Sequence, residues 1–193
     1  MVFKQHTISK LALPIFIAST ILLVLAKIIP FYHLNYSDFY VDIDRAVALF
    51  FFLWAYHALY VRAFSIKPYI ALFGAAIVFL AVVVFSSSGL SIQKAIMIFF
   101  LTAFVEEILA RGILLSIASH WLGKYKAVLA TSILFTLVHP NVYANYTYGL
   151  AVFALGILLG VVFLSFQERA YGVVASTFIH ALVVLVGFKV GLL

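Results

Sequence analysis

The sequence contains no cysteine, which excludes disulfide bonds, thiolate metal ligands and a cysteine nucleophile. It also contains few charges: Asp, Glu, Lys and Arg make up 9% of its 193 residues, whereas a soluble domain averages about 25%. Hydrophobic residues account for 67% of the chain. This composition predicts a single polytopic membrane domain. The net charge of +6 does not indicate nucleic-acid binding, because Lys and Arg of membrane proteins concentrate in cytoplasmic loops.

Long apolar segments alternate with short polar stretches along the whole chain. Backbone groups must be satisfied internally in lipid, so helices are expected, and about 20 apolar residues cross the hydrocarbon core. We therefore predict an all-α bundle of about seven spanning segments, at residues 11–29, 46–64, 69–85, 92–118, 126–139, 148–166 and 171–188. Residues 1–91 are expected to form accessory helices, and residues 92–193 the catalytic core. With the N-terminus in the cytoplasm, most Lys and Arg residues fall on the cytoplasmic side, which favours that orientation.

Charged residues interrupt the fourth apolar segment. Glu106, Glu107 and Arg111 lie within the run FVEEILARGILL. A charge near the bilayer centre is costly, so such residues usually face a protein interior or a water-filled cavity and serve a function there. Residues four apart share a helix face, which predicts an ion pair between Glu107 and Arg111. Glu106 projects elsewhere and is therefore the better candidate for a general base.

Two histidines lie at about the same depth as Glu106, on other segments. At a rise of 1.5 Å per residue, Glu106, His139 and His180 lie roughly 14–20 Å from the cytoplasmic ends of their segments. A carboxylate and two imidazoles in one layer predict a hydrolytic site. These side chains also match three ligands of a catalytic zinc site with an open fourth position. Because a carboxylate and a histidine can activate water directly, we expect catalysis without a metal or other cofactor.

In their order along the chain, these residues resemble the motifs of the CAAX-protease and bacteriocin-processing family of intramembrane proteases (CPBP, or Abi). The segment from Glu106 to Arg111 resembles the family's EExxxR motif, and Phe135-x-x-x-His139 resembles its FxxxH motif. Residues 153–160 resemble the glycine-bearing helix that follows, and residues 175–182 resemble the last motif, a helix ending in HxxxN. The resemblance covers residues 102–188 and implies a helical fold with a conical cavity open to membrane and cytosol.

The resemblance also implies an activity and residue roles. The activity is hydrolysis of a peptide bond in a membrane-associated substrate, and the expected location is a prokaryotic cell membrane. Carried over by motif position, Glu106 and His139 activate the water, and His180 helps to hold the oxyanion. Glu107 and Arg111 support the site.

One motif position departs from the family. The Asn that ends HxxxN falls on Val184, whose apolar side chain cannot donate a hydrogen bond to an oxyanion. Either catalysis is weaker or another donor substitutes, and the candidates are Asn141, Asn145, Ser176 and Thr177.

Two other functions stay open on the sequence alone. The departure at Val184 favours a catalytically silent relative that acts as a membrane scaffold or immunity protein. A proton-coupled transporter would use Glu106 and His139 as a relay. Transporters usually show paired repeats of broken helices, and the sequence contains none.

Overall fold

The structure is a computed structural model in which the chain forms two compact units, Met1–Ile66 and Lys67–Leu193. The residues that it describes are 14–15, 17–19, 21–22, 33–36, 39–42, 47–51, 53, 67–86 and 89–190. The first two predicted spanning segments, 11–29 and 46–64, therefore lie largely outside the described residues. All predicted site residues belong to the second unit.

A short hairpin stands out in the first unit. Strands β1 (His33–Tyr36) and β2 (Phe39–Asp42) pair in antiparallel orientation, with Tyr36 opposite Phe39. Strand β2 contains three residues that favour strands, Phe39, Tyr40 and Val41, whereas β1 contributes Tyr36. The all-α prediction did not include this hairpin, whereas every other described element is helical.

The second unit is built from helices alone, as far as residues 67–86 and 89–190 describe it. Residues 92–122 form one long helix without a break, in which α4, α5 and α6 are joined by two π-helical stretches. The helices are α3 (Lys67–Phe85), α4 (Ile92–Met97), α5 (Val105–Glu107), α6 (Ser116–Leu122), α7 (Lys124–Leu137), α8 (Tyr146–Ser165) and α9 (Arg169–Lys189). A single 3₁₀ turn, Pro140–Tyr143, follows α7.

Three of these helices, α3, α8 and α9, are long and apolar enough to cross a membrane. Their ends lie within two residues of the segments predicted at 69–85, 148–166 and 171–188. The hydrophobic composition and these helices make the chain an integral membrane protein. The total of seven spanning segments and the boundary at residue 91 stay predictions.

The predicted helix at 126–139 is wrong at its C-terminal end. Helix α7 ends at Leu137, and His139 has an extended backbone with φ −98° and ψ 108°. Pro140 explains this, because the residue before a proline is disfavoured in the helical region. His139 therefore lies just beyond the helix, on the segment that leads into the 3₁₀ turn.

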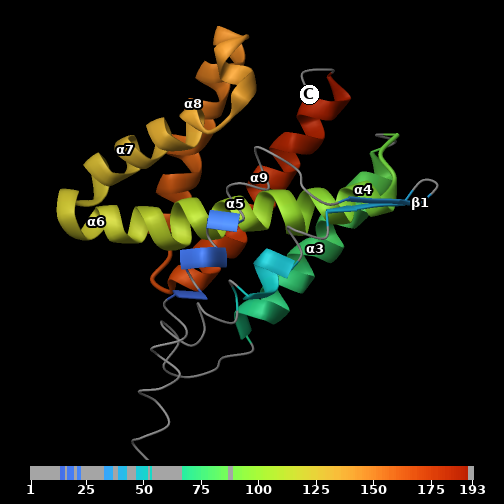
Figure 1. Cartoon of the computed structure of the whole chain (residues 1–193), viewed down its shortest axis with the longest axis horizontal. Helices are drawn as coiled ribbons and strands as arrows, with labels where there is room; N and C mark the ends of the chain where they lie inside the picture. Colours follow the sequence, from blue (N-terminus) through green and yellow to red (C-terminus); the bar gives the residue numbers. More distant parts are fainter. Residues whose placement is uncertain are drawn as a thin grey trace, which may run out of the picture. The chain divides into compact units, whose positions relative to one another are not determined.

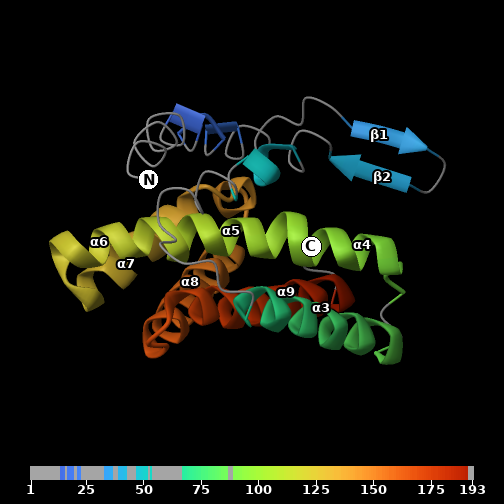
Figure 2. The same ribbon diagram turned by 90° about the horizontal axis from the view of Figure 1, so that it is seen from below.

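The helices of the second unit pack as a bundle around the long helix 92–122. Helices α3 and α9 lie side by side, α7 packs against α6 and α8, and α8 packs against α9 (Figures 1 and 2). Figure 1 also shows that α8 and α9 diverge with distance from the connection between them. Large fully buried side chains of the core include Phe79, Phe99, Leu115, Leu159 and Phe163.

Glycines let α8 approach α7 closely, as the small-xxx-small pattern predicts. A Cβ atom on Gly156 would lie 3.1 Å from Ser132 Cβ, and one on Gly160 would lie 3.0 Å from a methyl group of Val128. Both contacts are tighter than ordinary van der Waals distances. The pattern therefore sets the spacing of the two helices beside the polar residues of the core.

The closest approach involves Gly172, near the start of α9, and yields a stability prediction. A Cβ atom there would lie 2.7 Å from the Phe163 carbonyl oxygen, a backbone atom that cannot move away alone. We expect Gly172→Ala to lower the free energy of unfolding by about 1–3 kcal/mol, the usual cost of overpacking. Thermal unfolding in detergent measures this.

Gly74→Ala in α3 is the matched control, because nothing lies within 4 Å of the added Cβ. Alanine has the higher helix propensity, so this variant should be at least as stable as the wild type. Equal unfolding temperatures for Gly172→Ala and the wild type would show that α8 and α9 can separate at no cost.

Candidate active site

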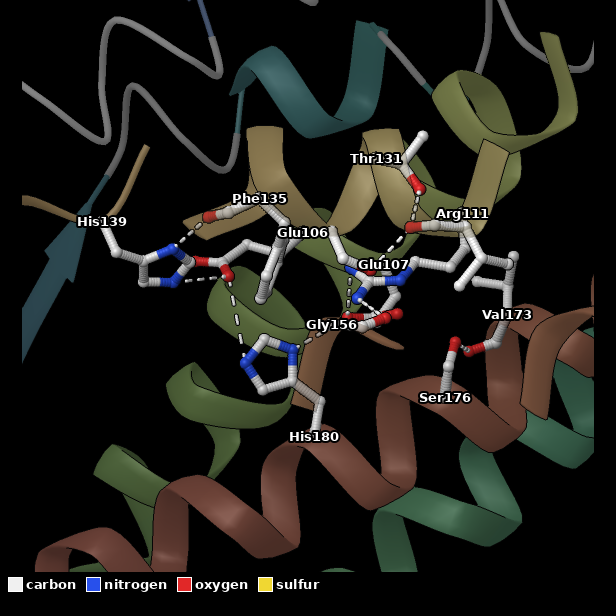
Figure 3. A network of polar contacts seen from close by, with 12 residues as sticks. Glu106, Glu107, Arg111, Thr131, Phe135, His139, Gly156, Val173, Ser176 and His180 are labelled. Carbon is white, nitrogen blue, oxygen red and sulfur yellow. Dashed lines mark hydrogen bonds and ion pairs between the residues drawn. The ribbon is translucent and has the colours of Figure 1, made fainter. Parts of the chain in front are cut away.

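Three side chains predicted to form the site converge in the core of the second unit. Glu106 Oε2 lies 3.5 Å from His139 Nε2 and 3.9 Å from His180 Nε2 (Figure 3). Glu106 belongs to α5, His139 follows α7 and His180 belongs to α9. The structure thus brings together the carboxylate and both imidazoles, from three separate elements.

The backbone around the two glutamates is unusual. Helix α5, Val105–Glu107, lies between π-helical stretches Ile98–Phe104 and Ile108–Leu115. Such wide turns are rare in proteins and frequently occur at functional sites, where they redirect side chains. Here Glu106 faces the two histidines, whereas Glu107 is fully buried on another side of the helix.

The predicted ion pair between Glu107 and Arg111 is confirmed. Arg111 Nη1 lies 3.3 Å from Glu107 Oε1, and both side chains are buried. Arg111 Nη2 also donates a hydrogen bond of 3.1 Å to the Gly156 carbonyl oxygen. The planar guanidinium group thereby links the long helix to α8, which a point-charged ammonium group would do less well.

Glu107 has a second partner that the sequence did not predict. His180 Nδ1 lies 3.0 Å from Glu107 Oε1, although the two residues are 73 positions apart. A carboxylate only accepts hydrogen bonds, so Nδ1 carries a proton and donates it. This bond directs His180 Nε2 away from Glu107 and toward Glu106.

His139 is oriented by a backbone carbonyl instead. Its Nδ1 lies 2.6 Å from the Phe135 carbonyl oxygen. Because a carbonyl oxygen can only accept, Nδ1 carries the hydrogen, and in the neutral ring Nε2 is then an acceptor. The Nε2 lone pair therefore points toward Glu106.

The ring of Phe135 contacts three polar side chains of the site. Its centroid lies 4.7 Å from that of His139 and 5.8 Å from that of His180. The Arg111 guanidinium carbon lies 4.3 Å above the same ring, in cation–π geometry. The phenylalanine of the FxxxH motif therefore packs between both imidazoles and the Arg111 guanidinium.

The four candidate replacements for the missing asparagine differ in their surroundings. Ser176 donates its hydroxyl to the Val173 carbonyl, and Asn145 Oδ1 caps α8 by accepting from Tyr148 N–H. Thr177 Oγ1 is fully buried and has no hydrogen-bond partner among the described residues. Asn141 lies in the exposed 3₁₀ turn. No hydrogen bond joins any of the four to the Glu106–His139–His180 cluster within the described part of the chain.

The same cluster bears on the zinc alternative. Among the described residues, no three carboxylate or imidazole groups lie together as a metal site requires. The Nδ1 atoms of both histidines are held by Phe135 or Glu107 and their Nε2 atoms face Glu106, an arrangement that metal-ligating histidines also have.

The fold and this polar cluster define an integral membrane protein whose helical core contains two carboxylates, an arginine and two imidazoles. Residues 88–186 match the family described as type II CAAX prenyl endopeptidase Rce1-like. Because that match covers half of the chain, the protein belongs to this family of CAAX-type proteases, as its motifs indicated. Comparisons with curated proteins and with solved structures found no match.

Proposed function

We propose that the protein is an intramembrane endopeptidase in which Glu106 and His139 activate water to cleave a membrane-associated substrate. The observation that carries the proposal is the position of Glu106 Oε2, 3.5 Å and 3.9 Å from the Nε2 atoms of His139 and His180. Membership of a CAAX prenyl endopeptidase family supports the peptidase activity.

The protonation pattern suits a water molecule between Glu106 and His139. In the neutral form of His139, Nε2 accepts a hydrogen bond, as the Glu106 carboxylate does, so one water molecule between them can donate to both. Their separation of 3.5 Å also exceeds an ordinary hydrogen bond of about 2.7–3.2 Å. A water molecule has two donors and can satisfy both groups, while its lone pair stays available for attack.

The chemistry then follows general base and general acid steps. The water oxygen attacks the peptide carbonyl carbon while a proton of that water passes to Glu106. The tetrahedral intermediate collapses, the C–N bond breaks and the same proton passes to the leaving nitrogen. The products are a carboxylic acid, which keeps the second proton of the water until it ionises, and an amine, which can take up that proton.

His180 is placed to act on the oxyanion of that intermediate. In the imidazolium form both ring nitrogens carry protons, so Nε2 can donate to the oxyanion while Nδ1 donates to Glu107. Glu107 provides the counter-charge, and Arg111 fixes Glu107 in turn. Oriented donors of this kind stabilise the transition state strongly because they need no reorganisation.

The substrate class and the location belong to the same proposal. The family description supports a membrane-associated protein substrate with a prenylated C-terminal CAAX sequence. We place the N-terminus in the cytoplasm, because most Lys and Arg residues then fall on the cytoplasmic side. The family resemblance favours a prokaryotic cell membrane.

Val184 favours a second candidate, a silent relative that acts as a scaffold or immunity protein. The test is cleavage by the purified protein in detergent, with a farnesylated CAAX peptide and a non-prenylated transmembrane peptide as probes. The proposal expects cleavage of at least one probe by the wild type. A folded wild-type protein that cleaves neither would support the silent relative.

We expect this activity to survive removal of divalent metal. The water is activated by Glu106 and His139 in this proposal, so prolonged treatment with a zinc chelator should leave the turnover number unchanged. Cleavage of the farnesylated peptide before and after treatment measures this. Activity that disappears and returns on addition of zinc would make Glu106, His139 and His180 metal ligands instead.

A further inference from the structure

The proposed mechanism leaves the oxyanion with one side-chain donor, His180, because the second position of the family motif is Val184. Val184 is partly buried and apolar. Losing one such donor typically costs about 100-fold to 1000-fold in turnover. A second donor from another element would remove this deficit, and it has to be polar, accessible to substrate and close to Glu106.

Tyr148 meets these conditions in the first turn of α8. Its partly buried ring packs against a buried cluster formed by Ala110, Phe135 and Val152. Phe135 is the ring that also contacts both histidines, and Ala110 lies four residues after Glu106 on the long helix. The Tyr148 side chain therefore borders the same layer of the core as the catalytic candidates.

The hydroxyl group of Tyr148 is available for a ligand. It makes no hydrogen bond within the part of the chain that the structure describes, whereas the nearby Tyr143 hydroxyl donates to the Leu137 carbonyl. A phenol is a good neutral donor, because it needs no change of charge to hold an oxyanion.

The topology places Tyr148 at about the level of Val184. Helices α8 and α9 are consecutive and antiparallel, and they are joined by residues 166–168. Tyr148 precedes the end of α8 at Ser165 by 17 residues (165 − 148), and Val184 follows the start of α9 at Arg169 by 15 residues (184 − 169). At 1.5 Å per residue these distances are roughly 26 Å and 23 Å. The two helices diverge with distance from this connection (Figure 1).

We propose that the Tyr148 hydroxyl donates a hydrogen bond to the oxyanion, in place of the asparagine that the family motif has at Val184. This inference rests on the proposed peptidase activity. None of the four donors considered from the sequence is needed.

The test is Tyr148→Phe, which removes one oxygen atom and keeps the ring. We expect turnover of the farnesylated CAAX peptide to fall by about 100-fold to 1000-fold, with KM nearly unchanged, because the bond forms only in the transition state. Tyr146→Phe is the matched control, since it makes the same change two residues away on an exposed side chain. That control should cleave at the wild-type rate.

Rescue separates a catalytic role from a structural one. Val184→Asn restores the motif donor, so the double variant Tyr148→Phe/Val184→Asn should recover most of the lost turnover. A defect that Val184→Asn leaves uncorrected would assign Tyr148 to packing and overturn the inference. Wild-type turnover in Tyr148→Phe, with Glu106→Gln inactive, would overturn this inference alone. A wild-type protein that cleaves neither probe would contradict the proposed function as well.

Discussion

Replacement of Glu106 by Gln is expected to abolish proteolysis and to leave the protein folded and inserted. The amide keeps the shape of the carboxyl group, but it cannot take a proton from water. Removal of a general base costs about 100-fold to 10,000-fold in turnover. The substitution also removes the negative charge that lies 3.5 Å from His139 Nε2. The measurement is the turnover number of the purified variant with the farnesylated CAAX peptide.

Glu168→Gln provides the control for this substitution. It makes the same chemical change at an exposed position before α9, where the side chain makes no capping hydrogen bond. This variant should retain wild-type turnover. Substrate processing by Glu106→Gln at the wild-type rate would remove Glu106 from the mechanism.

The second large effect concerns stability. We expect Glu107→Gln and Arg111→Met each to lower the free energy of unfolding by about 3–5 kcal/mol, because each leaves an uncompensated buried charge. Glu107→Gln should also lower turnover, since the Glu107 carboxylate orients His180. The double variant should be less destabilised than the sum of the two, because replacing both partners of a buried pair can be close to neutral.

Thermal unfolding of the four proteins in detergent closes a double-mutant cycle. Arg169→Met serves as the control, because Arg169 is exposed and its guanidinium contacts only the Phe163 ring at 5.1 Å among the contacts described. That change should shift unfolding little. Strictly additive effects of Glu107→Gln and Arg111→Met would argue against a coupled buried pair.

The local features of the site were predictable from the sequence, because helix periodicity determines them. Spacing by four residues pairs Glu107 with Arg111, and the structure confirms the ion pair at 3.3 Å. Adjacent residues on a helix project in different directions, so Glu106 was expected to lie apart from the ion pair. In the structure it faces His139 and His180. The limits of α3, α8 and α9 followed from the length of apolar segments for the same reason.

Contacts between distant residues were not predictable, since no local spacing encodes them. The bond between His180 and Glu107 spans 73 positions, and the sequence assigned Glu107 to Arg111 alone. The π-helical stretches beside α5 have no signature in the residue pattern. The extended backbone of His139 does have a local signal, because Pro140 disfavours the helical region at the residue before it. Tyr148 lacks a motif, and only its packing against Phe135 and its neighbours draws attention to it.

The source of the oxygen atom in the product tests the central claim most directly. The claim is that a water molecule activated by Glu106 and His139 attacks the peptide carbonyl directly, without an intermediate covalently bound to the enzyme. The measurement is a single turnover in ¹⁸O-labelled water, with enzyme in excess over the farnesylated CAAX peptide, followed by mass spectrometry of the new carboxyl terminus. The account predicts one ¹⁸O atom in that carboxylate at the first turnover. A product without ¹⁸O would contradict it, because the oxygen would then have come from an enzyme carboxylate such as Glu106, acting as a nucleophile.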